Sequence, residues 1–149
     1  MTAKEYLGQI RLADIKIRQL QERLESMKSI GGAMQYDKIQ VQSSPSNATE
    51  DRLISIIDLE EEIRARIVSN EAIKTKIAFE IQALSDTRYI DALYYRYVLC
   101  MRAEEIAVTM NYEYGALRKI LVQARASFAE KYGLDQEMGG DIWAFTGSD

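Results

Sequence analysis

Residues 103–120 read AEEIAVTMNYEYGALRKI, and the spacing of the apolar side chains in this stretch decides how the rest of the chain is interpreted. Ile106 and Met110 lie one helical turn apart, and Ala107 is small enough for a second helix to cross closely above it. Leu117 and the isoleucine three residues later would close the same core from that second helix. The stretch therefore predicts a helix-turn-helix.

The turn between the two predicted helices falls at Asn111, because asparagine is second only to glycine in tolerating the left-handed backbone that such a turn needs. If Glu113 precedes the second helix, four side chains lie on the face of that helix opposite its apolar positions. They are Tyr114, Arg118, Lys119 and Gln123. We expect Arg118 to suit a guanine edge in a DNA major groove, and Lys119 and Arg102 to suit phosphates.

Composition favours helices and excludes most catalytic chemistry. The 149 residues include a single proline, Cys100 is the only cysteine, and histidine is absent. One chain therefore offers no disulfide, no Cys/His zinc site and no histidine-based catalysis. The run Glu60-Glu61-Glu62 is interpreted as a solvated helix face, because consecutive helical residues point in different directions. We expect an all-α protein that is not an enzyme and needs neither cofactor nor metal.

Two long amphipathic helices are expected within residues 1–85. The first begins at a capping box formed by Thr2 and Glu5 and is expected to end at Gly31-Gly32. The second is expected to begin, after a long polar connection, at Asn47 or Thr49. The apolar seam of the first helix consists of Ala3, Tyr6, Ile10, Ala13, Ile17, Leu20, Leu24 and Met27. The stripe of the second consists of Leu53, Ile56, Ile63, Ile67, Ile77, Ile81 and Leu84.

These two stripes have similar lengths, and antiparallel pairing into a coiled-coil-like hairpin buries both of them most simply. Asn70 interrupts the second stripe. We favour a rotation of the helix that presents Ile73 in its place over a buried asparagine that fixes register or oligomeric state. Ser85-Asp86-Thr87 should break the second helix and begin a small helical domain over residues 86–132.

Charge is distributed unevenly about a net value of −4. Residues 86–132 carry seven positive and six negative charges, and Arg96, Arg102, Arg118, Lys119 and Arg125 are expected to form a local basic patch. Residues 133–149 are expected to be a flexible acidic tail, in which the cluster Ile142, Trp143 and Phe145 either docks on a surface or has no role. With neither a signal peptide nor a long apolar run, the chain is expected to be cytoplasmic and to bind no membrane.

Residues 88–128 resemble region four of bacterial sigma factors. The resemblance rests on Leu93-Tyr94-Tyr95-Arg96-Tyr97, on Glu104-Glu105-Ile106-Ala107 and on the helix from Leu117 to Ala124. The long helices, with Val41-Gln42-Ser43-Ser44 and Ile57-Asp58-Leu59-Glu60, resemble the phage and mobile-element regulators of the ArpU and RinA type. This resemblance implies promoter recognition together with RNA polymerase and activation of phage or mobile-element genes.

The sequence departs from the sigma-like pattern at several positions. Arg102 stands where a Ser or Thr usually caps the first helix of the motif, Glu113 replaces the usual Ser before the second, and Cys100 takes a position often held by Gly.

The sequence supports two hypotheses about function. The first is a DNA-binding regulator whose helical hairpin forms a homodimer or contacts polymerase. The second is a helical assembly protein, such as a small terminase-like component of phage DNA packaging, in which the long helices drive oligomerisation.

Overall fold

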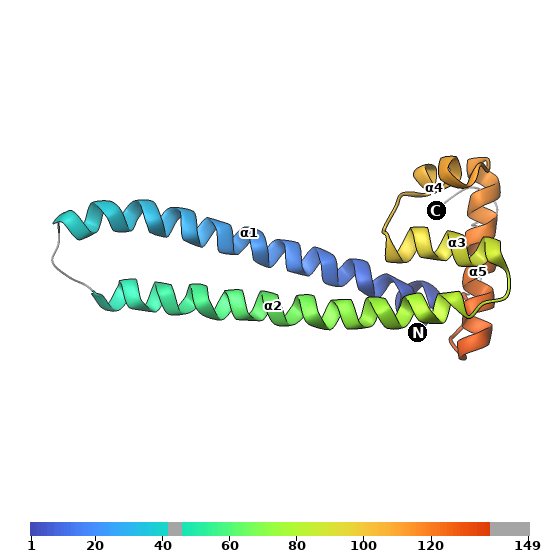
Figure 1. The fold of residues 1–149 in the computed structure, drawn as a ribbon, viewed down its shortest axis with the longest axis horizontal. Helices are drawn as coiled ribbons and strands as arrows, with labels where there is room; N and C mark the ends of the chain where they lie inside the picture. The colour runs from blue at the N-terminus through green and yellow to red at the C-terminus, as the bar shows by residue number, and fades with distance from the viewer. Residues whose placement is uncertain (42–45, 138–149) are drawn as a thin grey trace. The chain divides into compact units, whose positions relative to one another are not determined.

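The computed structural model describes residues 1–41 and 46–137, and most of these residues are helical (Figure 1). The elements are α1 (Ala3–Val41), α2 (Ser46–Gln82), α3 (Thr87–Leu93), the π-helix η1 (Tyr94–Val98), α4 (Ala103–Met110) and α5 (Tyr114–Tyr132). Within the described residues a lone bridge between Thr2 and Asp135 is the only β-type pairing. The all-α prediction is confirmed.

The chain divides into two compact units. The two-helix unit is Ala13–Glu71, and the C-terminal unit combines Met1–Leu12 with residues from Ala72 onward. The first turns of α1 and the last turns of α2 therefore belong to the C-terminal unit.

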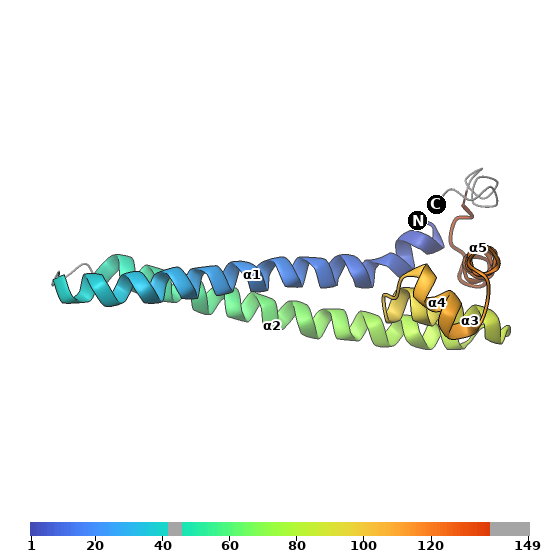
Figure 2. The same cartoon turned by 90° about the horizontal axis from the view of Figure 1, so that it is seen from above.

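In the two-helix unit, α1 and α2 run in opposite directions (Figure 2). Ile17 and Leu20 of α1 form a buried cluster with Ile63 of α2. Nζ of Lys28 lies 2.9 Å from a carboxylate oxygen of Glu60. Residues further along α1 therefore contact residues nearer the start of α2, as antiparallel pairing requires. Only part of the apolar stripe predicted for α2 is covered, because Leu53 and Ile67 are 47% and 38% exposed.

Asn70 is buried in this unit at 3% exposure, so the prediction that the helix would rotate it outward is wrong. Its Nδ2 donates a hydrogen bond of 2.7 Å to Oδ1 of Asp14 on α1, while Ile73 is half-buried in the C-terminal unit. The hydrogen bond to Asp14 offsets part of the free-energy cost of burying the Asn70 amide. The spacing of residues along α2 does not reveal this partner on α1.

The prediction that α1 ends at Gly31-Gly32 is also wrong, because the helix continues to Val41. A glycine inside a helix costs about 1 kcal/mol relative to alanine but, unlike proline, removes no hydrogen bond and creates no clash. The second helix begins at Ser46, close to the predicted start.

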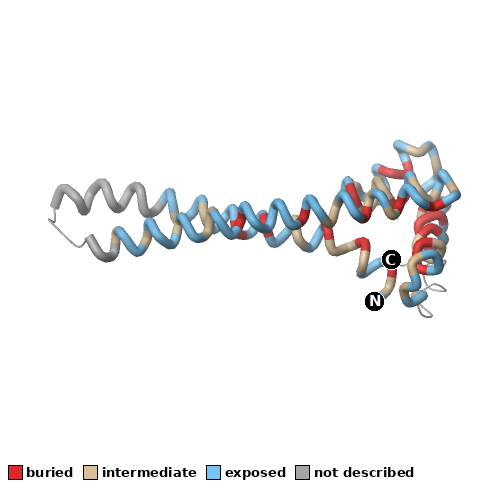
Figure 3. The backbone as a smooth tube through the Cα atoms, turned by 60° about the horizontal axis from the view of Figure 1, so that its bottom comes forward, coloured by how far each residue is buried: buried red, intermediate tan, exposed pale blue. Residues whose placement is uncertain are grey.

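The C-terminal unit is built around Phe128, which is fully buried. Its ring lies 5.9 Å from that of Tyr6 and 4.7 Å from that of Tyr132, between centroids. Both tyrosine hydroxyls donate to Glu80: Tyr6 to its carboxylate at 2.6 Å and Tyr132 to its backbone carbonyl at 2.8 Å. Buried positions follow α5 for most of its length (Figure 3). Helix α5 is therefore the central element of this unit.

The connection from α3 to α4 contains a π-helix and a left-handed residue. Helix α3 begins after Asp86, as expected, with its carboxylate accepting from the Arg88 N–H at 2.9 Å. It passes directly into the π-helix, which no pattern had indicated. Cys100 then adopts a left-handed φ of 55°, in agreement with its place at a position expected to favour glycine.

Candidate nucleic-acid interface

Helix α4 begins at the expected place, but with an unusual cap. The backbone N–H of Arg102 donates to a carboxylate oxygen of Glu105 at 3.0 Å, so the glutamate three residues later satisfies a donor at the helix start. The Arg102 side chain is 75% exposed, and its Nε lies 3.6 Å from the same carboxylate. Its positive charge is therefore partly neutralised by a neighbour.

The connection between α4 and α5 turns sharply at Asn111, with φ 61° and ψ 46°. The prediction of a left-handed asparagine at this position is confirmed. The N–H of Asn111 donates to the carbonyl of Val108 at 3.2 Å, and that of Tyr112 to the carbonyl of Ala107 at 2.9 Å. These bonds satisfy carbonyls at the end of α4 and fix the direction in which α5 departs.

Beneath this turn, α4 and α5 share the core predicted from the spacing of their apolar residues. Ile106 and Leu117 are fully buried, and Ala107 is 5% exposed, small enough to bring the two helices together. Ala92 of α3 and Leu121 of α5 complete the cluster. Sequence reasoning missed both of these, and the only available signal for Ala92 was a small residue inside an apolar stretch.

Four predicted contact residues occur on the outward side of α5. Tyr114 is 40% exposed, and the Arg118 guanidinium carbon lies 5.5 Å from the centre of its ring, a cation–π distance. Lys119 and Gln123 are exposed. Oε1 of Gln123 accepts a hydrogen bond of 3.4 Å from the hydroxyl of Tyr89 on α3, which sequence reasoning did not include.

Acidic residues lie at or just before the start of both α4 and α5. Glu113 is the exposed residue before α5, and its side chain makes no capping hydrogen bond. Glu104 and Glu105 occupy the first turn of α4, where the helix dipole favours negative charge. The exposed cations of α5 therefore form a narrow strip, preceded in the sequence by Glu113, rather than a broad basic patch.

Arg125 occupies a different environment from the other predicted contact residues. Its side chain is 12% exposed, and Nε donates to a carboxylate oxygen of Glu137 at 2.5 Å, while a terminal nitrogen donates to the Tyr97 hydroxyl at 3.4 Å. Burial lowers the pKa of this guanidinium, but Tyr97 and Glu137 outweigh it, so the pKa is raised above its ordinary value. Arg125 is a structural cation and does not share the exposed strip.

Arg96 is engaged in the same way, because it donates to the Met101 carbonyl at 2.9 Å and is only partly exposed. Of the five cations expected to form one patch, Arg96 and Arg125 thus hold the fold together and Arg102 faces a carboxylate. Arg118 and Lys119 carry the strip on α5.

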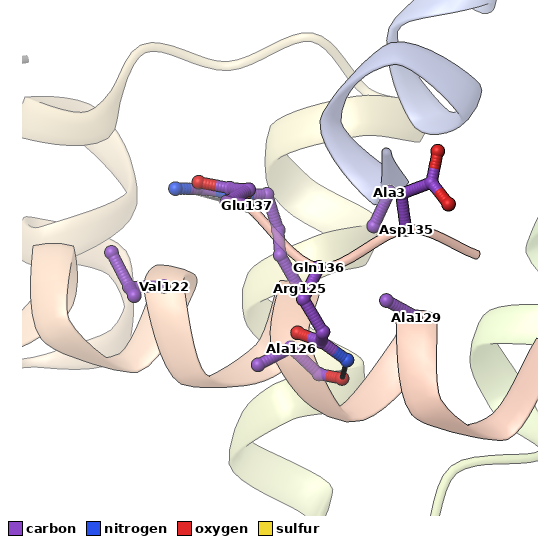
Figure 4. A pocket seen from close by; sticks show the side chains of 8 residues that line it. All are labelled: Ala3, Val122, Arg125, Ala126, Ala129, Asp135, Gln136 and Glu137. Carbon is purple, nitrogen blue, oxygen red and sulfur yellow. Dashed lines mark hydrogen bonds and ion pairs between the residues drawn. The ribbon is translucent and has the colours of Figure 1, made fainter. Parts of the chain in front are cut away.

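Figure 4 shows the residues around the Arg125 side chain, where residues 134–137 return along α5. The Gln136 side chain donates to the Ala126 carbonyl at 3.2 Å, and Leu134 N–H donates to the Ala129 carbonyl at 2.9 Å. The hollow that Arg125, Gln136 and Glu137 help to line has a volume of about 10 Å³, room for one water molecule and no cofactor. The first residues of the segment expected as a flexible tail are therefore packed, and the cluster Ile142, Trp143 and Phe145 lies outside the described residues.

The part of the chain that the structure describes contains no group of three His, Cys, Asp or Glu residues arranged to hold a metal ion. None of its helices is long and apolar enough to cross a membrane. Comparison with protein-family models, with curated proteins and with solved structures finds no match.

Proposed function

We propose that this chain is a sequence-specific DNA-binding regulator of transcription, in which α4 and α5 act as a helix-turn-helix and α5 enters the major groove. The observation that carries the proposal is the left-handed turn at Asn111, which sets α5 against α4 over a shared core and leaves Tyr114, Arg118 and Lys119 outside it. An α-helix with its side chains is about 10–12 Å across, which matches a major groove of about 12 Å.

The side chains of the strip suit distinct parts of a duplex. Arg118 is braced against the ring of Tyr114, which restrains its planar guanidinium for a two-hydrogen-bond contact with a guanine edge. Lys119 is exposed and suits a phosphate as a flexible point charge. Gln123 lies one turn further along and suits an adenine edge.

The charge balance supports assisted binding rather than binding by a single copy. A strip with few cations and neighbouring glutamates makes few phosphate contacts, so one domain would bind weakly. Two linked domains, or a domain held beside RNA polymerase at a promoter, would gain effective concentration. The resemblance to regulators of the ArpU and RinA type leads to the same proposal. Residues 1–85 of this chain would then form a helical hairpin for self-association or partner binding.

Fluorescence anisotropy on the purified protein tests the proposal. A duplex is first selected from the chain's own promoter region, and the protein is then compared with Arg118→Ala plus Lys119→Ala. The matched control is Lys16→Ala plus Arg18→Ala, which removes two exposed cations from α1. We expect the strip variant to lose about tenfold or more in affinity and the control to bind as the parent does. Equal binding by all three would reject the recognition face.

A second candidate function is a helical assembly protein, such as a small terminase-like packaging component. The observation that favours it is the apolar surface of α2, where Ile54, Ile57 and Val68 are 55%, 52% and 67% exposed. Light scattering distinguishes the two, because a ring-sized oligomer of many subunits indicates packaging and a monomer or dimer indicates regulation.

A further inference from the structure

Helix α2 has a second apolar stripe that does not face α1. Ile63 and Asn70 are buried against α1, whereas Ile57 and Val68 are more than half exposed. Glu61 and Arg64 are exposed between them. The four positions follow steps of four, three and four residues, which places them along one line on a helix.

The order of residues along this line is self-complementary when read in the opposite direction. It runs apolar, acidic, basic, apolar, so reversing it brings Ile57 opposite Val68 and Glu61 opposite Arg64. A parallel copy would instead place Glu61 against Glu61 and Arg64 against Arg64, and like charges directly opposed oppose association.

The neighbouring charges reinforce this direction. Residues 50–62 of α2 carry six acidic side chains and one arginine, whereas residues 64–76 carry Arg64, Arg66, Lys74 and Lys76 against Glu71. Of the acids beside the stripe, Glu60 already pairs with Lys28, and Glu62 pairs with Arg66 at 3.0 Å. Glu61 and Arg64 are thus the charges that the stripe itself presents.

We propose that this stripe binds a second copy of the chain, with the two α2 helices antiparallel about a two-fold axis between Glu61 and Arg64. Two paired helices cannot bury all of their apolar side chains, and Ile54, Ile57 and Val68 remain exposed to water. Covering these side chains with a second copy removes them from water, which favours association. The inference stands on α2 alone and does not depend on DNA binding, so it is tested without DNA.

Analytical ultracentrifugation of the full chain is the first test. We expect the parent to dimerise and Glu61→Arg to raise the dissociation constant about tenfold or more, because each of two symmetry-related contacts becomes repulsive. The double variant Glu61→Arg plus Arg64→Glu restores both contacts and should restore the dimer. Arg18→Glu, an exposed reversal on α1, is the control and should leave the dimer intact. A monomeric parent, or a double variant as weak as the single one, overturns the proposal.

Disulfide trapping tests the direction of pairing. In a Cys100→Gly background, which removes the only native cysteine, Ile57→Cys and Val68→Cys are made as separate proteins. An offset of eleven residues separates like positions by about 16 Å along antiparallel helices, too far for a disulfide. We expect cross-linking only when the two proteins are mixed. Efficient cross-linking of either protein alone indicates a parallel pair and rejects the antiparallel arrangement.

Discussion

Nδ2 of Asn70 on α2 donates a hydrogen bond of 2.7 Å to Oδ1 of Asp14 on α1, joining the two helices through a side chain that is only 3% exposed. Oδ1 of Asn70 is buried and has no hydrogen-bond partner among the described residues. A buried acceptor left unpaired costs free energy, while a single polar pair between two helices fixes their register. We therefore expect the pair to lower the stability of the two-helix unit while fixing how its helices align.

Replacing Asn70 with leucine, which has a similar shape, should raise the free energy of unfolding by about 1 kcal/mol, because the unpaired acceptor disappears and Asp14 can reach water. Asn70→Asp keeps the size but sets a carboxylate against Asp14 and should destabilise instead. Urea unfolding followed by circular dichroism measures both variants. A clear loss of stability in Asn70→Leu contradicts the interpretation that the buried amide is costly.

Cys100→Gly should stabilise the C-terminal unit. A residue with a Cβ atom pays about 1–2 kcal/mol for a left-handed backbone, whereas glycine does not, and Cys100 has a φ of 55°. We expect a gain of about 1 kcal/mol after the loss of its partly buried side chain. The control is Cys100→Ala, which keeps the Cβ atom and should give no gain, so an equal gain in both variants would point to the thiol rather than the backbone.

Local stereochemistry could be predicted from the sequence, and contacts between distant residues could not. Asn111 and the buried pair Ile106 and Leu117 were predicted because a turn and two helix faces depend on residues a few positions apart. The burial of Asn70 depends on Asp14, fifty-six positions away. Sequence periodicity carries no information about such a partner.

The expected position of Arg125 on an exposed patch is wrong for the same reason, because its partner is distant in the sequence. Arg125 was expected to join a basic patch with Arg118 and Lys119, but it is held by Glu137 from a segment that composition assigned to a flexible tail. The end of α1 was also wrongly predicted, but for a local reason. Gly31-Gly32 was taken as its end because glycine is common there, yet glycine only weakens a helix and does not stop it.

Glu137→Gln should destabilise the C-terminal unit by about 2 kcal/mol. The ion pair is mostly buried, with side chains 12% and 22% exposed, so removing the carboxylate charge leaves the guanidinium poorly compensated. Glu130→Gln, an exposed acid on α5, is the matched control and should change stability by less than about 0.5 kcal/mol. Thermal unfolding of the two variants separates a buried pair from a general loss of negative charge.

Stability should fall at high pH in part because of Tyr6. Burial, together with the hydrogen bond to Glu80, raises the pKa of its hydroxyl from 10.0 to about 12. The folded state then keeps a proton that the unfolded state loses, so this contribution is complete below pH 10 and is lost as pH rises through 12. Tyr6→Phe removes the titrating group, and its stability relative to the parent should rise across this window. A constant difference between the two proteins in urea unfolding at successive pH values would contradict the assignment.

If α5 reads DNA as proposed, Arg118 and Lys119 should affect binding in different ways. A lysine on a phosphate releases about one counterion, so Lys119→Ala should reduce the slope of log affinity against log salt by about 1 and weaken all duplexes alike. Arg118→Ala should instead flatten the preference at one base position, because the contact that its stacked guanidinium makes with a guanine edge is lost. Anisotropy titrations over a salt series, on the selected duplex and on single-base variants of it, measure both quantities. A shared loss of slope with unchanged base preference would mean that both cations contact phosphates, and that the sequence is read by other residues.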